Sequence, residues 1–298
     1  MPSSPVIDVD SLNLHYGDFH AVKDLSFQVE RGELYALLGT NGAGKTSTLE
    51  VVEGHRRAGS GSVRVFGKDP GQRRSVRPRT GIMLQESGFS ADLTVEESVR
   101  LIGRLSGRAD SVRRVVDVVD LAHKAGTRVS QLSGGEKRRL DFATAVYGRP
   151  ELIFLDEPTT GLDIRSRDAL WRAVEQLRED GSTIVLTTHY LEEAQEHADR
   201  IGLMHQGSFR HQGTVAELTR TLPATITFSL PADAPAPPLQ PAHRADGTLL
   251  VETFDLQRDL KGLLDWADVH RVELTGLSAG PTRLDDVFRA IGTEPAPS

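Results

Sequence analysis

The phosphate-binding pattern G-x-x-x-x-G-K-[ST] is matched by the residues Gly39-Thr40-Asn41-Gly42-Ala43-Gly44-Lys45-Thr46. Residues 34–38 before it are apolar and predict a short buried strand, and residues 46–53 after it predict the first turns of a helix. Glycines let several backbone N–H groups point into one concavity, and the helix N-terminus adds partial positive charge. We therefore expect the chain to bind a nucleoside triphosphate.

Two side chains of this loop have expected chemical roles. Lys45 is expected to reach the β- and γ-phosphates, and the Thr46 hydroxyl is expected to ligate Mg²⁺. The alternative is a glycine-rich turn with one exposed lysine, and the full match between a strand and a helix argues against it. The nucleotide-binding groups predicted in this segment are Gly39, Asn41, Gly42, Gly44, Lys45, Thr46 and Ser47.

Composition limits the class of protein. The chain has 298 residues, enough for one large domain and a small one, and its 38% hydrophobic and 26% charged residues are ordinary for a globular protein. No apolar run approaches the roughly 18–20 residues that span a bilayer, and residues 1–5 lack the features of a signal peptide. The absence of cysteine excludes disulfides and thiolate metal sites and agrees with a cytosolic protein. The net charge of -7 argues against nucleic acid as a partner.

Residues 1–222 alternate between strand-like and helix-like segments, which predicts an α/β domain. Residues 6–16 and 25–29 alternate in polarity and predict an N-terminal antiparallel β layer. Short apolar runs predict a mostly parallel core sheet at residues 34–38, 80–84, 152–155, 184–187 and 201–204. Residues 93–147 show helical spacing without a strand pattern, so we expect an inserted helical subdomain there.

Residues 223–298 have a different character. Five prolines between residues 231 and 241 predict a loop. Strand patterns at residues 224–230, 249–253 and 271–277, with helix patterns at 256–266 and 282–291, predict a small C-terminal α+β appendage. We expect residues 293–298 to be disordered and the appendage to serve as a contact surface, although it could simply cover apolar surface.

A second run with chemical potential is the apolar segment 152–155, which ends in Asp156 and Glu157. A buried strand ending in Asp156 places its carboxylate beside the phosphate loop, where it can hold Mg²⁺ directly or through water. Glu157 is then positioned to orient and deprotonate the attacking water. Taken alone, such a run can also be a strand that meets a solvated turn.

The third motif is Leu132-Ser133-Gly134-Gly135-Glu136, which precedes a helical pattern. Ser133, Gly134 and Gly135 at a helix start offer a hydroxyl, free N–H groups and the helix dipole, which together suit an anion. In isolation this segment could equally be an ordinary helix cap.

Together and in this order, the three motifs resemble the nucleotide-binding subunit of an ATP-binding-cassette (ABC) transporter, and the resemblance covers about residues 6–222. The family pattern also matches Tyr16 (stacking on adenine), Gln85 (linking nucleotide to the membrane partner), Asp163 (a dimer-interface loop) and His189 (γ-phosphate sensing). Each of these four alone could be a structural residue. Position 136 is Glu where many members have Gln.

The resemblance implies a P-loop ATPase whose cofactors are ATP and Mg²⁺. It implies catalytic roles for Glu157, His189 and Gln85, and Mg²⁺ ligation by Thr46, Gln85 and Asp156. It also implies a head-to-tail dimer of cassettes, as a homodimer or heterodimer. Two ATP molecules would lie between the phosphate loop of one subunit and the Ser133–Gly135 signature of the other. The pore would belong to a separate transmembrane permease, and the cassette would lie on the inner face of the cell membrane.

Three segments resemble the drug- and antibiotic-exporter branch of daunorubicin-resistance type. They are residues 85–97, residues 188–194 and residues 284–288. An importer ATPase would share the same chemistry and remains an alternative, as does a soluble cassette ATPase that acts on ribosomes or DNA. The single cassette, the lack of a long coiled coil and the acidic charge argue against the latter.

Overall fold

The computed structural model describes residues 4–84, 88–220, 223–231, 234–243 and 247–281, together with Leu284, Val287 and Phe288. The chain divides into two compact units, with the boundary between Thr214 and Val215. The short helix α8 (Val215–Thr219) therefore groups with the second unit, whereas the sequence placed it in the first domain.

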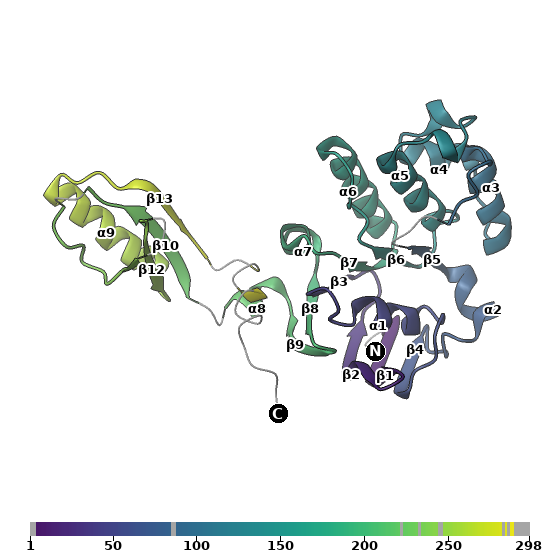
Figure 1. The fold of residues 1–298 in the computed structure, drawn as a ribbon, viewed down its shortest axis with the longest axis horizontal. Helices are drawn as coiled ribbons and strands as arrows, with labels where there is room; N and C mark the ends of the chain where they lie inside the picture. Colours follow the sequence, from purple (N-terminus) through teal and green to yellow (C-terminus); the bar gives the residue numbers. More distant parts are fainter. Residues whose placement is uncertain are drawn as a thin grey trace. The chain divides into compact units, whose positions relative to one another are not determined.

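The core of the first unit is a six-stranded sheet with strand order β5-β6-β7-β3-β8-β9 (Figure 1). Its strands are β3 (Leu34–Gly39), β5 (Thr80–Met83), β6 (Leu152–Asp156), β7 (Thr183–Thr187), β8 (Arg200–His205) and β9 (Ser208–Gly213). The first five in this order are parallel, and β9 pairs with β8 in the antiparallel direction. Since β7 lies between β6 and β3, the carboxyl ends of all three meet at one edge. The predicted fold class is confirmed.

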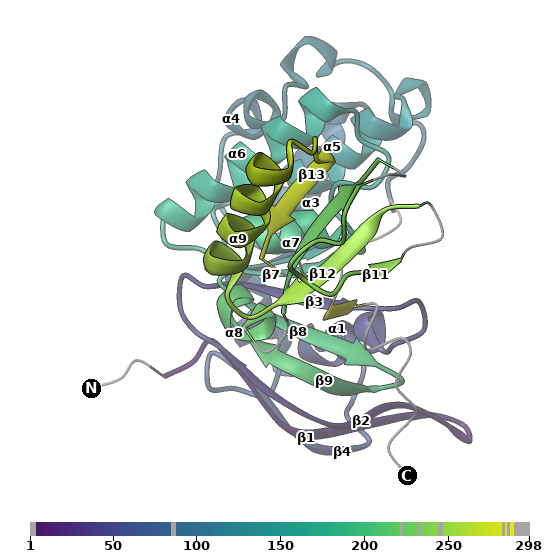
Figure 2. The same ribbon diagram turned by 90° about the vertical axis from the view of Figure 1, so that its left-hand side faces the viewer.

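A second, antiparallel sheet has the order β2-β1-β4. It contains β1 (Ile7–Tyr16), β2 (Phe19–Val29) and β4 (Ser60–Val65). Strand β2 begins six residues before the expected segment, and β4 was not predicted because most of its side chains are exposed and do not alternate. Helix α1 (Lys45–Val52) contacts β3 of the core sheet and also β2 and β4 (Figure 2). This arrangement fixes the direction of α1 between two sheets.

The helical subdomain comprises α3 (Val95–Ser106), α4 (Val112–Val118) and α5 (Gly134–Ala145), with short 3₁₀ turns at Ala122–Lys124 and Val129–Gln131. All of residues 93–147 are described and none lies in a strand of a sheet, as predicted. Thr94 and Glu97 form a reciprocal capping box that begins α3, and Gly107 ends it in the left-handed conformation. The remaining helices of this unit are α2 (Arg73–Val76), a 3₁₀ turn η1 (Arg77–Arg79), α6 (Ile164–Glu179) and α7 (Leu191–His197).

The second unit contains, besides α8, a four-stranded antiparallel sheet with helix α9 (Leu256–His270) packed on it. Its order is β11-β12-β10-β13, formed by β10 (Ala224–Ser229), β11 (Ala242–His243), β12 (Leu249–Thr253) and β13 (Thr275–Gly280). Helix α9 places Leu263 against Ile226, Phe228, Leu249 and Val251. The predicted strand at 271–277 was placed too early, because Arg271 caps α9 in the left-handed conformation.

The expected C-terminal helix is described only at Leu284, Val287 and Phe288, which are helical, and the predicted disordered tail lies outside the described residues. Over the part of the chain that the structure describes, no helix has both the length and the apolar character needed to cross a membrane.

Candidate active site

The phosphate loop joins β3 to α1, and its glycines are required by the protein itself. Gly42 and Gly44 have φ of 78° and 100°, in the region that favours glycine. A Cβ on Gly44 would lie 2.6 Å from the Ala21 carbonyl oxygen, and one on Gly39 would lie 2.5 Å from that of Met204. The loop is therefore shaped by close backbone neighbours, and Gly44 also begins α1.

Lys45 lies folded against its own loop. Its side chain is buried, and Nζ donates to the carbonyl oxygens of Gly39 (2.7 Å) and Thr40 (3.2 Å). Burial lowers the pKa of the Lys45 ammonium, and the charges of Glu157 and Asp156 offset part of this. Thr46 is exposed. The loop thus carries a cation on its inner side and an exposed hydroxyl at the start of α1.

Asp156 ends β6 beside the end of β7, because Asp156 pairs with Thr187 in the parallel register. The Thr187 hydroxyl donates to Asp156 Oδ1. Burial raises the pKa of Asp156, and the Thr187 hydrogen bond lowers it only in part. A buried carboxyl group of this kind, which the charge of Lys45 also reaches, is suited to a cation.

Glu157 follows with a backbone φ of 49°, which is unusual for a residue with a side chain. Its N–H donates to the Thr187 carbonyl oxygen (3.0 Å) and also approaches the Thr187 hydroxyl (3.2 Å), and these contacts hold the turn. The carboxylate oxygen Oε1 lies 3.3 Å from His189 Nδ1, and Thr160 donates to Oε2 at 3.4 Å. The side chains of Glu157 and His189 are 17% and 44% exposed, so water can reach the pair.

Tyr16 lies at the end of β1, over the first turns of α1. Its hydroxyl lies 3.0 Å from Glu50 Oε2 and 3.2 Å from Ser47 Oγ. The Arg56 guanidinium covers one face of the ring at 4.4 Å from its centre and donates from Nε to the same Glu50 oxygen. Tyr16 is 38% exposed, and its expected stacking on adenine stays a prediction.

The signature segment begins α5 with a reciprocal capping box. The Glu136 N–H donates to Ser133 Oγ (3.2 Å), and the Ser133 N–H donates to Glu136 Oε2 (2.8 Å). Lys124 Nζ lies 2.6 Å from Glu136 Oε1. These contacts, the Lys124 hydrogen bond first, lower the pKa of Glu136 to about 2. The glutamate at position 136 thus has a structural role at the helix start.

Nothing in the described residues explains why glycine occupies positions 134 and 135 of this segment. A Cβ on Gly134 would meet nothing within 4 Å, and one on Gly135 would meet its nearest atoms, in Gly161 and Leu162, at an ordinary 3.7 Å. The helix start therefore lies beside the turn that leads to Asp163. No hydrogen bond or ion pair among described residues joins this segment to the phosphate loop.

Two predicted residues need separate comment. Asp163 Oδ1 accepts a hydrogen bond from the Ser166 N–H (2.8 Å) and caps α6, which is the structural alternative for this residue. Its expected interface role stays a prediction. Gln85 lies outside the described residues.

Arg138 is a residue that the sequence reasoning missed. Its guanidinium is buried and donates to the carbonyl oxygens of Leu84 (2.7 Å), Glu157 (2.7 Å) and Asp156. Burial lowers the pKa of Arg138. Helix α5 is thereby tied to the ends of β5 and β6. One sequence signal could have indicated that Arg138 is buried: it lies at helical spacing from Asp141, Phe142 and Ala145, which are buried on the same face of α5.

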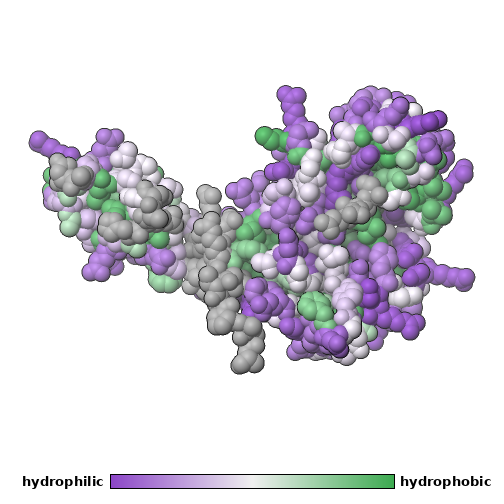
Figure 3. Space-filling view, viewed as in Figure 1, coloured by the Kyte–Doolittle hydropathy of each residue, from purple (hydrophilic) through white to green (hydrophobic). Residues whose placement is uncertain are grey.

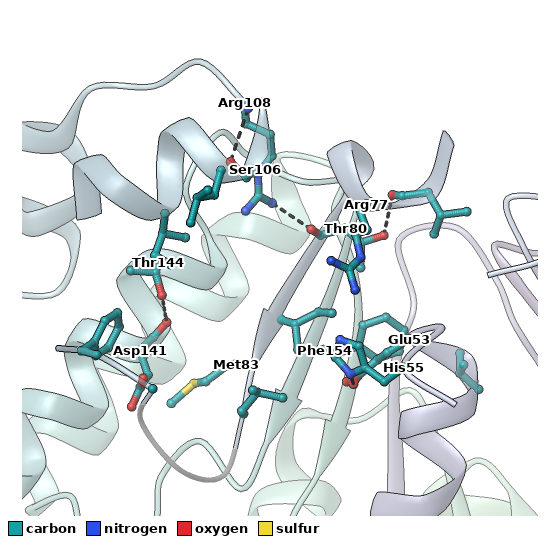
Figure 4. Close-up of a pocket in the computed structure, with 18 residues that line it drawn as sticks. Glu53, His55, Arg77, Thr80, Met83, Ser106, Arg108, Asp141, Thr144 and Phe154 are labelled. Atoms are coloured by element: carbon teal, nitrogen blue, oxygen red, sulfur yellow. Dashed lines mark hydrogen bonds and ion pairs between the residues drawn. The ribbon is translucent and has the colours of Figure 1, made fainter. Parts of the chain in front are cut away.

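A cavity of about 350 Å³ opens between the helical subdomain and the core (Figure 4). Asp141 and Thr144 of α5 lie on one side, and Glu53 and His55 after α1 lie on the other (Figure 4). Glu53 Oε2 and His55 Nδ1 are 3.1 Å apart. The lining also includes Leu84, which directly precedes Gln85 in the chain.

The donor set was compared with the needs of Mg²⁺. Among the described residues, no group of three or more His, Cys, Asp or Glu side chains could hold a metal by itself. Mg²⁺ prefers oxygen ligands and is commonly bound by one or two carboxylates together with water and substrate phosphates. The Thr46 hydroxyl and the Asp156 carboxylate suit that mode, in which a nucleotide completes the site.

Comparison with known families gives two matches. Residues 22–160 match the ABC transporter family, and residues 224–282 match the C-terminal domain of ABC transporter domain-containing proteins. The Nod factor export ATP-binding protein I of Burkholderia lata is 34% identical over 99% of both chains. The daunorubicin/doxorubicin resistance ATP-binding protein DrrA of Streptomyces peucetius is 35% identical over 97% of this chain and 93% of its own.

Solved structures agree in fold. An ATP-binding subunit of an ABC transporter is 26% identical, with a TM-score of 0.69 over 72% of this chain and 92% of its own. The dimeric bacterial ABC transporter cassette MJ0796 superposes with a TM-score of 0.63 at 24% identity, over 70% of this chain and 98% of its own. The chain therefore belongs to the ABC transporter family, as an ATP-binding and ATP-hydrolysing subunit of the exporter type.

Proposed function

We propose that this ATPase drives the export of drugs, antibiotics or other small molecules through a separate transmembrane permease. The observation that carries the proposal is similarity to drug-resistance and Nod factor export subunits over nearly the whole chain, including the second unit. The permease supplies the path across the membrane. The cassette works in the cytoplasm, on the inner face of the cell membrane.

In the proposed mechanism, the phosphate loop binds ATP at the edge where β3, β6 and β7 end. Lys45 exchanges its contacts with Gly39 and Thr40 for the β- and γ-phosphate oxygens, which are better partners for an ammonium. Tyr16 stacks on the adenine. Thr46 and Asp156 would hold Mg²⁺, with Gln85 as a further expected ligand, and the bound metal would supply neutralisation of the phosphate charge.

Glu157 acts as the general base. Its carboxylate takes a proton from the water that attacks the γ-phosphate, while His189, 3.3 Å away, orients that carboxylate and contacts the γ-phosphate. The backbone contacts of Glu157 with Thr187 and Arg138 keep the base at a fixed place relative to the loop.

The site is completed by a second cassette. Ser133 Oγ accepts a hydrogen bond from the Glu136 N–H, so its own hydrogen is available to a phosphate oxygen. Glycine favours helices less than alanine does, and no atom of the described residues crowds Gly134 or Gly135 so as to require glycine there. Close approach of the ATP bound to a partner cassette would explain why glycine is present at these two positions. Asp163 lies at the same interface.

The permease binds at the cavity between the helical subdomain and the core. This cavity borders Leu84, and the chain continues from there to Gln85, so its occupant can sense the nucleotide. Leu105 also lines it and is 74% exposed, which suits an apolar partner segment. The second unit contains no proposed catalytic group and provides a further contact surface.

The test is affinity purification of the tagged chain from its native membranes, with ATPase assays of the purified complex. We expect a multi-helix membrane protein to copurify and to stimulate ATP hydrolysis. In vesicles whose cassettes face the outside, ATP added outside should drive drug from the cassette side into the vesicle lumen. Without that ATP, no drug should accumulate. Copurification of ribosomal RNA or DNA instead of a membrane protein would refute the proposal, and inward transport would establish the importer alternative.

A further inference from the structure

The chain is acidic overall, but one segment is strongly basic. Residues 55–79 contain eight Lys or Arg side chains and a single acid, Asp69, whereas the whole chain has a formal charge of -7. The eight are Arg56, Arg57, Arg64, Lys68, Arg73, Arg74, Arg77 and Arg79. All but Arg79 are exposed. We call this set the basic surface. In Figure 3 the region over α2 and β4 is predominantly hydrophilic.

Two members of the basic surface already have carboxylate partners. Arg56 pairs with Glu50 at 2.9 Å, and Arg79 binds both carboxylate oxygens of Glu151 at 2.6 and 2.8 Å. These two arginines have structural roles. In both cases the arginine is paired with a carboxylate of the same chain.

The arginines around the neighbouring hollow differ. A hollow of about 770 Å³ between β4, α2 and the end of α1 is bordered by Arg57, Arg64 and Arg73, together with Arg56 and one carboxylate, Asp69. The Asp69 Oδ1 atom accepts a hydrogen bond from the Gly71 N–H (2.7 Å). Among the described residues, Arg57, Arg64 and Arg73 form no ion pair. Three like charges around one depression repel each other and offer donors that suit phosphate oxygens.

The basic surface is continuous with the cavity proposed for the permease. His55 lines both the hollow and that cavity, and Arg77 lines the cavity from the basic side. The exposed Leu84 and Leu105 line the same cavity. A cassette docked there on a membrane protein presents the adjoining basic surface to whatever surrounds the permease.

We propose that the basic surface binds the anionic phospholipid headgroups of the membrane, with the hollow bordered by Arg57, Arg64 and Arg73 as the principal phosphate contact. The inference rests on the proposed function for the direction in which the surface faces. Each Lys or Arg close to an anionic leaflet contributes about 1 kcal/mol, so several together hold a peripheral protein at the membrane.

The chemistry favours lipid over other polyanions. A lipid surface presents many mobile phosphates and needs no fixed register, which fits cations spread over a broad exposed surface. The rest of the chain is acidic and would repel a long nucleic acid. An acidic segment of the permease would instead have to place its carboxylates at fixed positions that match these widely spread cations.

The experiment measures sedimentation of the full-length protein with vesicles of phosphatidylcholine, with or without phosphatidylglycerol. The test variant combines Arg57→Glu, Arg64→Glu and Arg73→Glu. The control combines Arg113→Glu, Arg172→Glu and Arg258→Glu, three exposed arginines outside the basic surface. Both variants change the net charge equally, so a general charge effect is matched. ATP hydrolysis in solution and permease copurification are measured in parallel.

We expect the wild type to bind only vesicles with phosphatidylglycerol, and less so at high salt. The test variant should bind on the order of 10²-fold more weakly, since three contributions of about fivefold are lost, while the control should stay within a few-fold of wild type. Equal binding to neutral vesicles, or equal loss in the control, would overturn the proposal. So would a test variant that binds vesicles normally but loses the permease in detergent. Loss of permease copurification in the wild type would instead count against the proposed function alone.

Discussion

The glycine-rich turn that begins α1 and the one that begins α5 have similar composition but different surroundings. At the first, Gly39 and Gly44 face backbone carbonyls of Met204 and Ala21 at distances that exclude any side chain. At the second, Gly134 and Gly135 meet nothing closer than 3.7 Å within the described residues. The first turn needs its glycines for contacts within the chain, whereas the second has no such need among the described residues, as expected for a surface that another molecule approaches.

The two turns therefore differ in what they depend on: the first on the cassette itself, and the second, as proposed, on a partner cassette. The phosphate loop, Asp156 and Glu157 are positioned by the cassette's own sheet, so we expect a monomer to bind nucleotide. Among the described residues, no hydrogen bond or ion pair joins the Ser133–Gly135 segment to that loop, in keeping with its proposed action on a ligand held by a partner. Changes at the two places should therefore separate binding from dimer closure.

The largest effect is expected from Glu157→Gln, which removes the proposed base but leaves the phosphate loop intact. Hydrolysis should fall by roughly 10²–10⁴-fold, the usual contribution of a general base, with nucleotide affinity nearly unchanged. The variant should accumulate as an ATP-bound dimer in size-exclusion chromatography. The matched control is Glu192→Gln on α7, which should hydrolyse ATP like the wild type. Near-normal turnover of Glu157→Gln would remove this residue from its assigned role.

Lys45→Ala and Ser133→Arg test the two half-sites directly. Lys45→Ala should weaken monomer binding of ATP by about 10–10²-fold, since a charged hydrogen bond contributes about 1.5–3 kcal/mol. Ser133→Arg should leave monomer affinity unchanged but block ATP-dependent dimerisation by occupying the place of the partner's γ-phosphate. Calorimetry and light scattering measure the two quantities, with Lys261→Ala and Ser130→Arg as controls. An equal loss of monomer affinity in both variants would show that the comparison is wrong.

Alanine at single glycines sharpens the comparison further. Gly44→Ala should destabilise the fold by about 1–3 kcal/mol, because residue 44 has φ of 100° and would contact a carbonyl oxygen. Gly135→Ala should stabilise the monomer by about 0.5–1 kcal/mol through helix propensity, yet weaken ATP-dependent dimerisation. Denaturant unfolding measures both stabilities. Destabilisation by Gly135→Ala would reveal an intrachain need for glycine at the second turn.

The smallest effect concerns the Glu136–Lys124 pair at the second turn. The pKa of Glu136 is about 2, below its ordinary 4.5, so the stabilisation from its ionised form is present above about pH 4.5 and is lost as the pH falls toward 2. Glu136→Gln keeps an oxygen for the Ser133 N–H but loses the ion pair, and should cost about 0.2–1 kcal/mol at neutral pH. The difference from wild type should shrink at about pH 3. A pH-independent difference, or an equal one in Glu179→Gln, would exclude the pair as its cause.

Contiguous motifs could be predicted because their geometry is local. The phosphate loop, the strand that ends in Asp156 and the helix after Ser133 all follow from short patterns, and the parallel sheet follows from its apolar runs. The capping box of Ser133 and Glu136 was also readable, as an S-x-x-E pattern before a helix. Strand β4 was missed because its exposed side chains carry no period.

Contacts between distant segments could not be predicted from one sequence. Arg138 reaches the Leu84 carbonyl oxygen, 54 positions away, and Thr187 supports both Asp156 and Glu157 from the next strand. Arg56 covers Tyr16 only because β1 and the end of α1 come together in the fold. These partners depend on sheet order and on side-chain packing, which leave no spacing signature.

At position 157, a backbone conformation that lowers the stability of the fold coincides with the residue proposed as the general base. A residue with a side chain costs about 1–2 kcal/mol in this conformation, whereas glycine adopts it freely and asparagine more readily than glutamate. Selection for thermal stability alone would therefore replace position 157 with glycine or asparagine and discard the carboxylate. The chain keeps a strained residue at the position that we propose for the general base. A stabilised engineered cassette should therefore be assayed for turnover before its higher melting temperature is taken as an improvement.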